Sequence, residues 1–300
     1  MRRLLPLLVL VLVLAGCGGT GSVRTQEKAK LASTPVAIVV AAGDIACPPG
    51  SPVTKTTCRQ AATASLVRSL KPQKVIALGD LQYQKGSYAD FLGSYAKTWG
   101  TFRDRTIPVP GNHEYYTAGA AGYYKYWAGK TTKPGYYRTA INGWQVYVLN
   151  TNCDRVDCAA ERTWLAGALK AHPSRCAMIV GHHPRFSSGG EHGSALFMQS
   201  FWRIAQAAKV DVALSGHDHD YERFAPKLAT GTVSAGGIRQ FVSGAGGKSL
   251  YKKGATVAGS RFFLNTAPGV LRLRLTPTAY SWQYRDIWGK IRDSGTSACH

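Results

Sequence analysis

The 300-residue sequence predicts an α/β fold in which two mixed β-sheets pack together with helices outside them. One observation is that short apolar runs alternate with amphipathic stretches over residues 36–208. The other is that the chain after Ile238 contains several further strand-like runs. Alternation of strands and helices is typical of α/β proteins, so we expect this class rather than a helical bundle.

The individual elements follow from the spacing of their apolar residues. A short continuous apolar run predicts a buried strand, and apolar residues that recur every three to four positions predict a helix. Strands are predicted over 36–42, 74–78 and 177–180, and helices over 58–70, 88–99 and 194–208. Residues 136–140 and 144–149 flank Asn142-Gly143, a pair that favours a hairpin turn between two strands.

Length and composition favour one large domain over residues 35–300. This stretch is long enough for a full hydrophobic core, and two small domains are the alternative. We find no long polar tract and no repeat with a period of roughly 20 to 50 residues, which argues against disordered and solenoid classes. Residues 18–34 are polar and rich in Gly, Ser, Lys and Thr, so a linker is predicted there.

The chain is strongly basic, with a formal net charge of +21. Loss of residues 1–16 would remove Arg2 and Arg3 and leave a charge of +19. Such a charge favours polyanionic neighbours, including anionic lipids, wall polymers and phosphorylated substrates. No helix-turn-helix, zinc finger or ribonucleoprotein motif accompanies it, so we expect no dedicated nucleic-acid binding.

The first residues have the layout of an export signal. Arg2 and Arg3 precede an apolar run over 4–14, and small residues precede Cys17. The run is shorter than the roughly 20 residues that span a bilayer. The sequence Leu-Ala-Gly-Cys at 14–17 resembles the lipobox of bacterial lipoproteins. We therefore expect a signal peptide over 1–16, a lipidated tether over 17–34, and a protein outside the cytoplasm that is membrane-anchored at Cys17 or secreted.

Six further cysteines follow Cys17, an even number that suits disulfides in an oxidising compartment. Sequence alone allows about 15 pairings. Cys47 with Cys58 and Cys153 with Cys158 would each close a short turn-rich loop, which leaves Cys176 with Cys299. No CxxC spacing exists, so structural bridges are favoured over a zinc site.

Five of the apolar runs end in a glycine followed by a polar residue that can bind metal. These residues are Asp44, Asp80, Asn112 with His113, His182, and His217 with His219. Ligands collect beyond the carboxyl ends of strands in α/β sheets, and glycine lets the chain turn sharply off a strand. One such motif is weak evidence, because Asp after a strand is often only a helix cap. The five together predict one metal site.

In this order, the motifs resemble those of the calcineurin-like metallophosphoesterase family: an aspartate, GDxx, GNH(D/E), a histidine after a strand, and GHxH. The resemblance covers residues 41–221. It implies a four-layer sandwich with the two sheets in the middle. Many members carry a histidine two residues after the first aspartate, where this chain has Ala46. Tyr83 in Gly-Asp-Leu-Gln-Tyr instead resembles the tyrosine ligand of purple acid phosphatases.

The purple acid phosphatase resemblance implies two metal ions bridged by Asp80. The first would be held by Asp44, Asp80, Tyr83 and His219, and the second by Asp80, Asn112, His182 and His217. Carboxylate and phenolate oxygens suit Fe(III), whereas imidazoles and an amide suit a divalent Fe, Zn or Mn. Two metals about 3.5 to 4 Å apart can hold a bridging hydroxide as nucleophile and polarise phosphate oxygens.

The leaving alkoxide needs a proton, and His113 and His192 resemble the outer-sphere histidines that supply it. His183 is expected to point away from the metals or to stabilise its loop. Tyr221 and Arg223 in the run YERF are expected to support the site. Arg185 could bind a phosphate, but a surface ion pair is the favoured interpretation.

The resemblance therefore implies an exported, metal-dependent, acid phosphatase-like enzyme that hydrolyses phosphate monoesters through a metal-bound hydroxide. Its expected partners are small phosphorylated substrates, anionic envelope polymers, and the membrane through the lipid anchor. A phosphodiesterase with the same ligands is the close alternative, because loops such as 119–134 set the pocket shape. An alternative of another class is a surface lipoprotein that binds polyanions.

Overall fold

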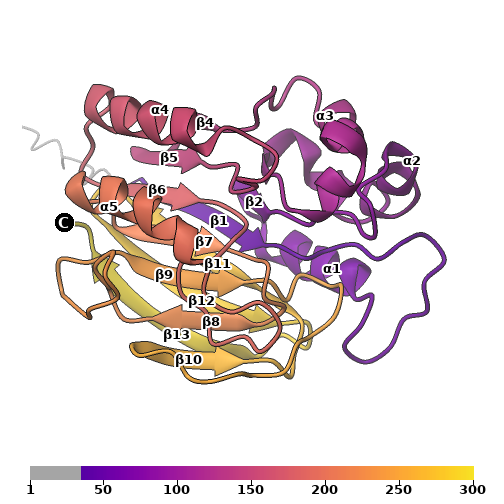
Figure 1. The fold of residues 1–300 in the computed structure, drawn as a ribbon. Helices are drawn as coiled ribbons and strands as arrows, with labels where there is room; N and C mark the ends of the chain where they lie inside the picture. Colours follow the sequence, from indigo (N-terminus) through magenta and orange to yellow (C-terminus); the bar gives the residue numbers. More distant parts are fainter. Residues whose placement is uncertain (1–34) are drawn as a thin grey trace, which may run out of the picture. The chain divides into compact units, whose positions relative to one another are not determined.

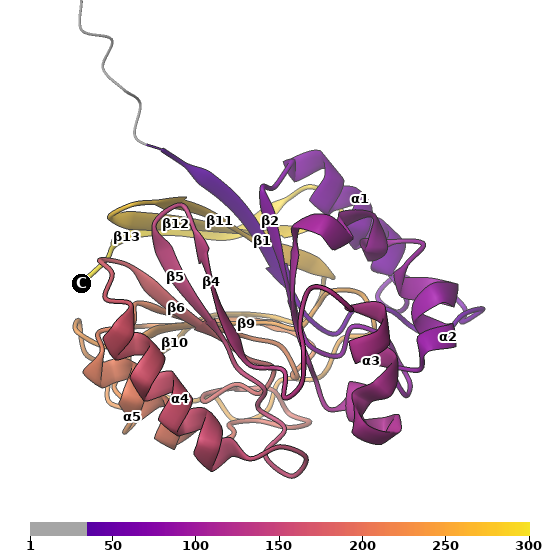
Figure 2. The same ribbon diagram turned by 90° about the horizontal axis from the view of Figure 1, so that it is seen from above.

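Two β-sheets lie face to face at the centre of the fold, and helices cover their outer faces (Figure 1, Figure 2). The computed structural model describes residues 35–300. The predicted signal peptide over 1–16, the predicted acylation site Cys17 and the predicted tether over 17–34 lie outside the described residues. Within the described part, no helix is long and apolar enough to cross a membrane.

The first sheet combines parallel and antiparallel strands. Its spatial order is β13 (Ile291–Ala298), β12 (Ala279–Asp286), β11 (Gly269–Thr276), β1 (Ala37–Ala42), β2 (Lys74–Leu78) and β3 (Thr106–Val109). Strands β1 to β3 are parallel, whereas β11 to β13 are antiparallel to their neighbours.

The second sheet is mixed in the same way. Its spatial order is β10 (Ser260–Leu264), β8 (Tyr221–Phe224), β9 (Arg239–Ser243), β7 (Val212–Ser215), β6 (Ala177–Val180), β5 (Trp144–Val148) and β4 (Tyr137–Ile141). Strands β5, β6, β7 and β9 are parallel. Strands β4 and β5 form the hairpin expected at Asn142-Gly143, where both residues have positive φ. The predicted pair of mixed sheets is confirmed.

Strand β1 shows why the sheets are buried on both faces. Val39 and Ala41 point into the apolar cluster between the sheets, whereas Val40 and Ala42 belong to the cluster beneath the first group of helices, and all four are fully buried. Side chains alternate between the two faces of a strand, so a continuous apolar run fits a strand that is covered on both sides.

The helices lie in two groups on the outer faces (Figure 2). The first group contains α1 (Gln60–Leu70), α2 (Tyr88–Asp90) and α3 (Ala121–Tyr126), and the second contains α4 (Cys158–Ala171) and α5 (Gln199–Ala207). Helices α4 and α5 bury Leu165 and Trp202 against Ile179 of β6. The resulting order is helices, sheet, sheet, helices, which confirms the four-layer expectation.

The helix expected over residues 88–99 is wrong beyond its first turn. Helix α2 ends at Asp90, a π-helical turn covers Phe91–Tyr95, and a 3₁₀ helix begins at Trp99. The backbone N–H of Tyr95 donates to Gln82 Oε1 at 3.0 Å, and Ala96 bonds five residues back to Phe91. A side chain distant in sequence thus takes one amide from the helix ladder.

Helix α4 was not predicted from the sequence, although its start carries a recognisable signal. Asp157 accepts hydrogen bonds from Ala159 N and Ala160 N at 2.9 and 3.0 Å, which is N-capping geometry. Its alanine-rich, weakly amphipathic sequence gives little periodicity to detect.

The three expected disulfides are all present: Cys47–Cys58, Cys153–Cys158 and Cys176–Cys299. The last joins the start of β6 to the end of β13, across 123 residues of chain. Residues 34–300 form one compact unit that contains both sheets, the three apolar clusters and these three bridges. Both sheets and all three bridges therefore belong to one compact unit.

A buried carboxyl in α4 predicts a pH-dependent stability. Glu161 is fully buried; its Oε1 accepts from Asn150 N at 2.8 Å and its Oε2 has no partner. Burial raises the pKa of Glu161 from 4.5 to about 8. Its folded pKa is thus above its unfolded value, so the stability contributed by the protonated form is present below about pH 4.5 and is lost as pH rises to about 8.

Glu161→Gln keeps the acceptor for Asn150 and removes this titration. We expect the variant to be more stable than wild type at pH 9, by on the order of 2–4 kcal/mol, and equal to it at pH 4.5. Urea unfolding at the two pH values measures the difference, with the exposed Glu191→Gln as control. A gain of the same size at both pH values would contradict the titration argument.

Candidate metal centre

The polar residues that follow five parallel strands meet at one edge of the two sheets. Asp44 follows β1, Asp80 follows β2, and Asn112 follows β3 in the first sheet. His182 follows β6, and His217 with His219 follow β7 in the second sheet. The two edges are joined by backbone bonds, since Gly43 N donates to Ser243 O at 2.8 Å. The expected convergence of the five motifs is therefore what the structure shows.

Tyr83 lies at the centre of the first group of candidate ligands. Its hydroxyl oxygen is 2.9 Å from Asp44 Oδ1, 3.1 Å from Asp80 Oδ2 and 2.9 Å from His219 Nε2. All four side chains are buried. Tyr83 N also donates to Ala46 O at 2.8 Å, so the tyrosine lies beside the position where a histidine is missing.

His182 lies at the centre of the second group. Its Nε2 is 3.3 Å from Asp80 Oδ2, 3.1 Å from Asn112 Oδ1 and 3.2 Å from His217 Nδ1. Ligand atoms of Asp80, His182 and His217 all lie within 4.8 Å of one another. Asp80 belongs to both groups, so it occupies the place of a bridging ligand.

Three of the candidate ligands have an unusual backbone conformation. Asp44, Asp80 and His217 have φ of 59°, 50° and 74°. Non-glycine residues with positive φ are strained, and such strain is often found at functional sites. Of the five preceding glycines only Gly79 has positive φ, so the turn off the other four strands does not depend on a left-handed glycine.

Two of the other glycines let the backbone pass close to the candidate ligands. A Cβ at Gly111 would lie 2.2 Å from Asp80 Oδ1, and one at Gly216 would lie 2.6 Å from Asp44 Oδ2. Only a residue without a side chain lets the backbone approach the carboxylates this closely.

The charge balance of the cluster fits metal ions. Asp44 and Asp80 are buried, and in the described part of the chain neither forms an ion pair with a lysine or arginine. Buried carboxylates require a cationic partner. Carboxylate, phenol, amide and imidazole donors facing one another are the donor set of a transition-metal site, so these residues fit a pair of metal ions.

The protonation of the histidines agrees with this interpretation. Burial by itself raises the pKa of Asp80, but His182 and His113 hold it well below its usual range. Burial lowers the pKa of His182, yet Asp80 raises it to about 10. Burial and His182 hold the pKa of His217 far below its usual value, which keeps a nitrogen lone pair free. A bound metal would replace the proton of His182, as is usual when metals bind imidazole.

Residues 33–221 match the family model for calcineurin-like phosphoesterases, which is more than half of the chain. The chain belongs to the calcineurin-like phosphoesterase family. Members of this family are phosphoesterases that use a dinuclear metal centre. A search of curated protein sequences found no match.

Solved structures with the same fold include phosphatases. A purple acid phosphatase from yellow lupin (Lupinus luteus) seeds superposes with a TM-score of 0.72 at 19% identity, over 88% of this chain and 54% of the lupin chain. A dimetal phosphatase from Danio rerio gives 0.55 at 12% identity, over 89% and 100%. The anchor protein of the Plasmodium inner membrane complex gives 0.65 at 14% identity, over 88% and 89%. The phosphoesterase thus spans about half the length of the lupin enzyme.

Glu114 holds the loops of this phosphoesterase together, and sequence reasoning did not assign it a role. The carboxylate is fully buried and accepts from the backbone N–H groups of Asp80 at 3.0 Å, Leu81 at 2.8 Å and Gly111 at 2.7 Å. It thereby fixes the loop after β2 against the loop after β3. A role for Glu114 could have been predicted from the sequence, because this residue directly follows the GNH motif.

Asp218 plays the corresponding role for the loop that carries His192. It accepts from Ser187 Oγ, from Gly193 N at 3.0 Å and from His192 N at 3.2 Å. The loop is therefore fixed by a residue between the two histidines of the GHxH motif. Asp218 was also missed, because its partners are distant in sequence.

Two further residues orient His219. Ser249 Oγ lies 2.8 Å from His219 Nδ1, which leaves Nε2 directed at Tyr83 and Asp44. The Tyr251 ring stacks on the His219 ring with centroids 3.8 Å apart. Hydrogen bonds to the second ring nitrogen commonly fix the tautomer of a ligand histidine.

The two expected proton donors lie next to the cluster. His113 Nδ1 is 2.6 Å from the carbonyl oxygen of Gln84, so it carries the hydrogen, and Nε2 faces Asp80 Oδ2 at 3.8 Å. The exposed His192 ring stacks on His217 with centroids 4.0 Å apart. His183 Nδ1 instead lies 2.7 Å from Thr151 Oγ1, which matches the expected stabilisation of its loop.

The remaining expected residues lie away from the cluster. Tyr221 and Arg223 both bind Asp293, Arg223 at 2.7 and 2.9 Å, and so join β8 to β13; they contact none of the candidate ligands through these bonds. The surface ion pair expected for Arg185 is wrong. Its side chain is buried over the Phe186 ring and donates to Ala229 O at 3.3 Å.

Proposed function

We propose that this phosphoesterase is an exported phosphatase that hydrolyses phosphate monoesters with two metal ions. The observation that carries the proposal is the position of Tyr83, whose hydroxyl lies within 3.1 Å of Asp44, Asp80 and His219. A tyrosine among carboxylates and an imidazole supplies the phenolate that the purple acid phosphatase type uses and that a centre without such a tyrosine lacks.

The proposed ligands of the two metal ions are the two groups of residues around Tyr83 and His182. Asp44, Asp80, Tyr83 and His219 would hold Fe(III), and Asp80, Asn112, His182 and His217 would hold a divalent Fe, Zn or Mn. Burial and Asp44 hold the pKa of Tyr83 well above its usual value, so the phenol loses its proton only to a strongly acidic metal ion. Fe(III) is the hardest and most acidic of these metals, which supports its assignment to this group.

The protein groups around the metals then have distinct tasks. Bound metal ions would supply Lewis acidity towards the phosphate oxygens. His113, fixed through Nδ1 by Gln84 O, presents Nε2 towards the cluster and can deliver a proton to the leaving oxygen. His192 lies at the exposed rim and can assist, while Glu114 and Asp218 keep both histidine loops in place.

Export is part of the proposal. The apolar run over 4–14 before Cys17 supports a signal with acylation, and the three disulfides support an oxidising compartment outside the cytoplasm. Small phosphorylated compounds and anionic envelope polymers are the partners that this location and the net positive charge favour.

An ester panel tests the substrate class. Protein loaded with iron and zinc should hydrolyse p-nitrophenyl phosphate and alkyl phosphates with kcat/KM at least about 100-fold above that for bis(p-nitrophenyl) phosphate. Preference for the diester would establish the phosphodiesterase alternative. Failure to cleave either ester with two metals bound would favour the polyanion-binding lipoprotein.

Colour tests the role of Tyr83. Iron-loaded wild type should show a phenolate-to-Fe(III) absorption band in the visible range, and Tyr83→Phe should lose it while keeping its iron. Tyr95→Phe is a matched control, since Tyr95 is equally buried but outside the cluster. A colourless wild type with iron confirmed at the site would rule out ligation by Tyr83.

A further inference from the structure

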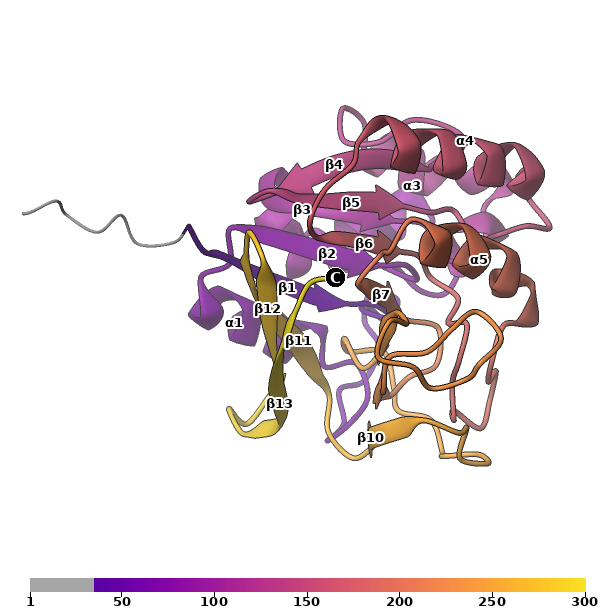
Figure 3. The same ribbon diagram turned by 90° about the vertical axis from the view of Figure 1, so that its left-hand side faces the viewer.

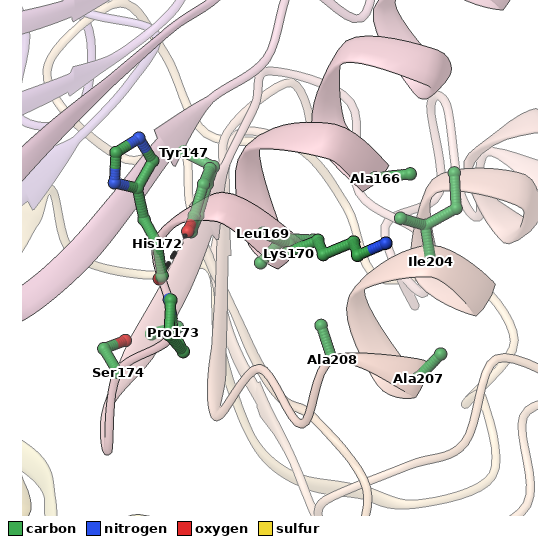
Figure 4. Close-up of a pocket in the computed structure, with 11 residues that line it drawn as sticks. Tyr147, Ala166, Leu169, Lys170, His172, Pro173, Ser174, Ile204, Ala207 and Ala208 are labelled. Atoms are coloured by element: carbon green, nitrogen blue, oxygen red, sulfur yellow. Dashed lines mark hydrogen bonds between the residues drawn. The ribbon is translucent and has the colours of Figure 1, made fainter.

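A groove opens between the C-terminal ends of α4 and α5, far from the metal centre (Figure 4). Its volume is about 560 Å³, within the usual range for small-ligand sites. Its walls are mostly apolar and include Leu169, Pro173, Ala177, Ile204, Ala207 and Ala208. Lys170 extends from α4 across the groove towards the end of α5 (Figure 4).

Lys170 lines the α4–α5 groove, and Arg175 and Lys209 directly follow the lining residues Ser174 and Ala208 in the sequence. Lys170, Arg175 and Lys209 are all exposed, and none of them forms an ion pair within residues 35–300. Lys170 lies in the last turn of α4, Arg175 precedes β6, and Lys209 follows α5. One unpaired cation in an apolar groove and two more next to its lining residues match a ligand with an anionic head and an apolar body.

The charge extends across the whole end of the fold where the parallel strands begin. Further basic residues at this end are Lys71, Lys74, Arg105 and Arg274. In the described segments around these strand starts, Asp104 is the only exposed acidic side chain, since Asp211 is buried and binds Ala177 N and His300. The groove therefore belongs to a broad basic face.

The described chain also begins at this end of the strands. Pro35 O and Leu275 O both accept from Asn142 Nδ2, at 2.9 and 3.0 Å, so the described chain starts beside the β4–β5 turn. Figure 3, which looks onto this end, shows the start of β1 and the C-terminal ends of α4 and α5 facing the same side. The metal centre lies at the opposite ends of the strands.

We propose that this face docks on a membrane of anionic phospholipid, with the headgroup phosphate at Lys170, Arg175 and Lys209 and an acyl chain in the α4–α5 groove. An acyl group on Cys17, where the sequence predicts one, would keep the protein close to the bilayer. Docking in this orientation leaves the metal centre open to the solvent side. The proposal does not depend on which ester the enzyme hydrolyses.

Vesicle co-sedimentation tests the proposal with the 34–300 segment, which forms one compact unit with its three disulfides and lacks the predicted signal and Cys17. Wild type should bind phosphatidylcholine vesicles that contain phosphatidylglycerol and should not bind pure phosphatidylcholine. Joint replacement of Lys170, Arg175 and Lys209 by Glu should weaken vesicle binding on the order of 100-fold. The reason is that each basic residue near an anionic surface adds to the free energy of membrane binding. Ala208→Trp, which fills the groove, should weaken it several-fold.

The matched control reverses the same number of charges elsewhere, at the exposed Lys125, Lys133 and Lys253. It should lower binding less than about threefold, and circular dichroism should show wild-type folding in every variant. Equal weakening by both triple variants, or no effect of Ala208→Trp, would overturn the proposal. The proposal would also be overturned if the protein bound short duplex DNA more tightly than the vesicles and lost that binding when Lys170, Arg175 and Lys209 are replaced by Glu. That result would define a general polyanion-binding surface.

Discussion

Asp80→Asn should abolish phosphatase activity, with kcat/KM lower by on the order of 10³-fold or more. Asn keeps the Oδ1 acceptor for His113 N at 2.8 Å, so the loop can stay folded. It replaces the charged Oδ2, which faces Tyr83 at 3.1 Å and His182 at 3.3 Å, with an amide that cannot bridge two cations. Losing metal stabilisation of several kcal/mol in the transition state gives an effect of this size.

Metal analysis shows whether the loss has this cause. Wild type should carry about two metals per chain and Asp80→Asn fewer than one, since one side chain serves both groups. Asp154→Asn changes the same atoms on an exposed residue and should keep both activity and metals. An Asp80→Asn protein that stays folded with two metals and full activity would exclude the bridging role.

His113→Ala should slow alkyl phosphates by about 10² to 10⁴-fold and activated aryl phosphates much less. An alkoxide is a poor leaving group and needs a proton, whereas p-nitrophenolate leaves without one. Metal content should not change, because His113 Nε2 is 3.8 Å from Asp80 Oδ2 and its ring packs between Tyr83 and Tyr116, with centroids 4.2 and 4.6 Å apart.

A second variant separates proton transfer from packing. His113→Asn can still donate to Gln84 O but cannot transfer a proton, so it should reproduce the selective loss on alkyl esters. His172→Ala, an exposed histidine far from the cluster, should behave as wild type. Equal slowing of alkyl and aryl esters would show that His113 positions the substrate instead.

The sequence was sufficient to predict the strands that bear the site. Residues 74–78 and 177–180 were predicted as strands and are β2 and β6 in the structure, because an apolar run covered on both faces has a clear pattern. Each apolar run ends where its strand reaches the edge of the sheet. The polar residue that follows could therefore be assigned to that edge without knowing how the strands pair. That geometry explains why Asp80 and His182 were found.

Residues whose partners are distant in sequence could not be found in this way. Asp218 binds Ser187 and Ser249 binds His219, over 31 and 30 residues, and no local pattern records such a pairing. Helix α2 ends early for the same reason, since the side chain of Gln82 takes the amide of Tyr95 from 13 residues away.

The sequence by itself determined which side chains could bind metals, since their chemical type and their place after apolar runs are local properties. Only the tertiary structure decided that Tyr83 meets Asp44 and His219, which are 39 and 136 residues away. It also decided that strained positive φ values fall on Asp44, Asp80 and His217 themselves. The reason is that packing one sheet against the other fixes where the strand ends meet, and the backbone adapts at the residues that must face one another.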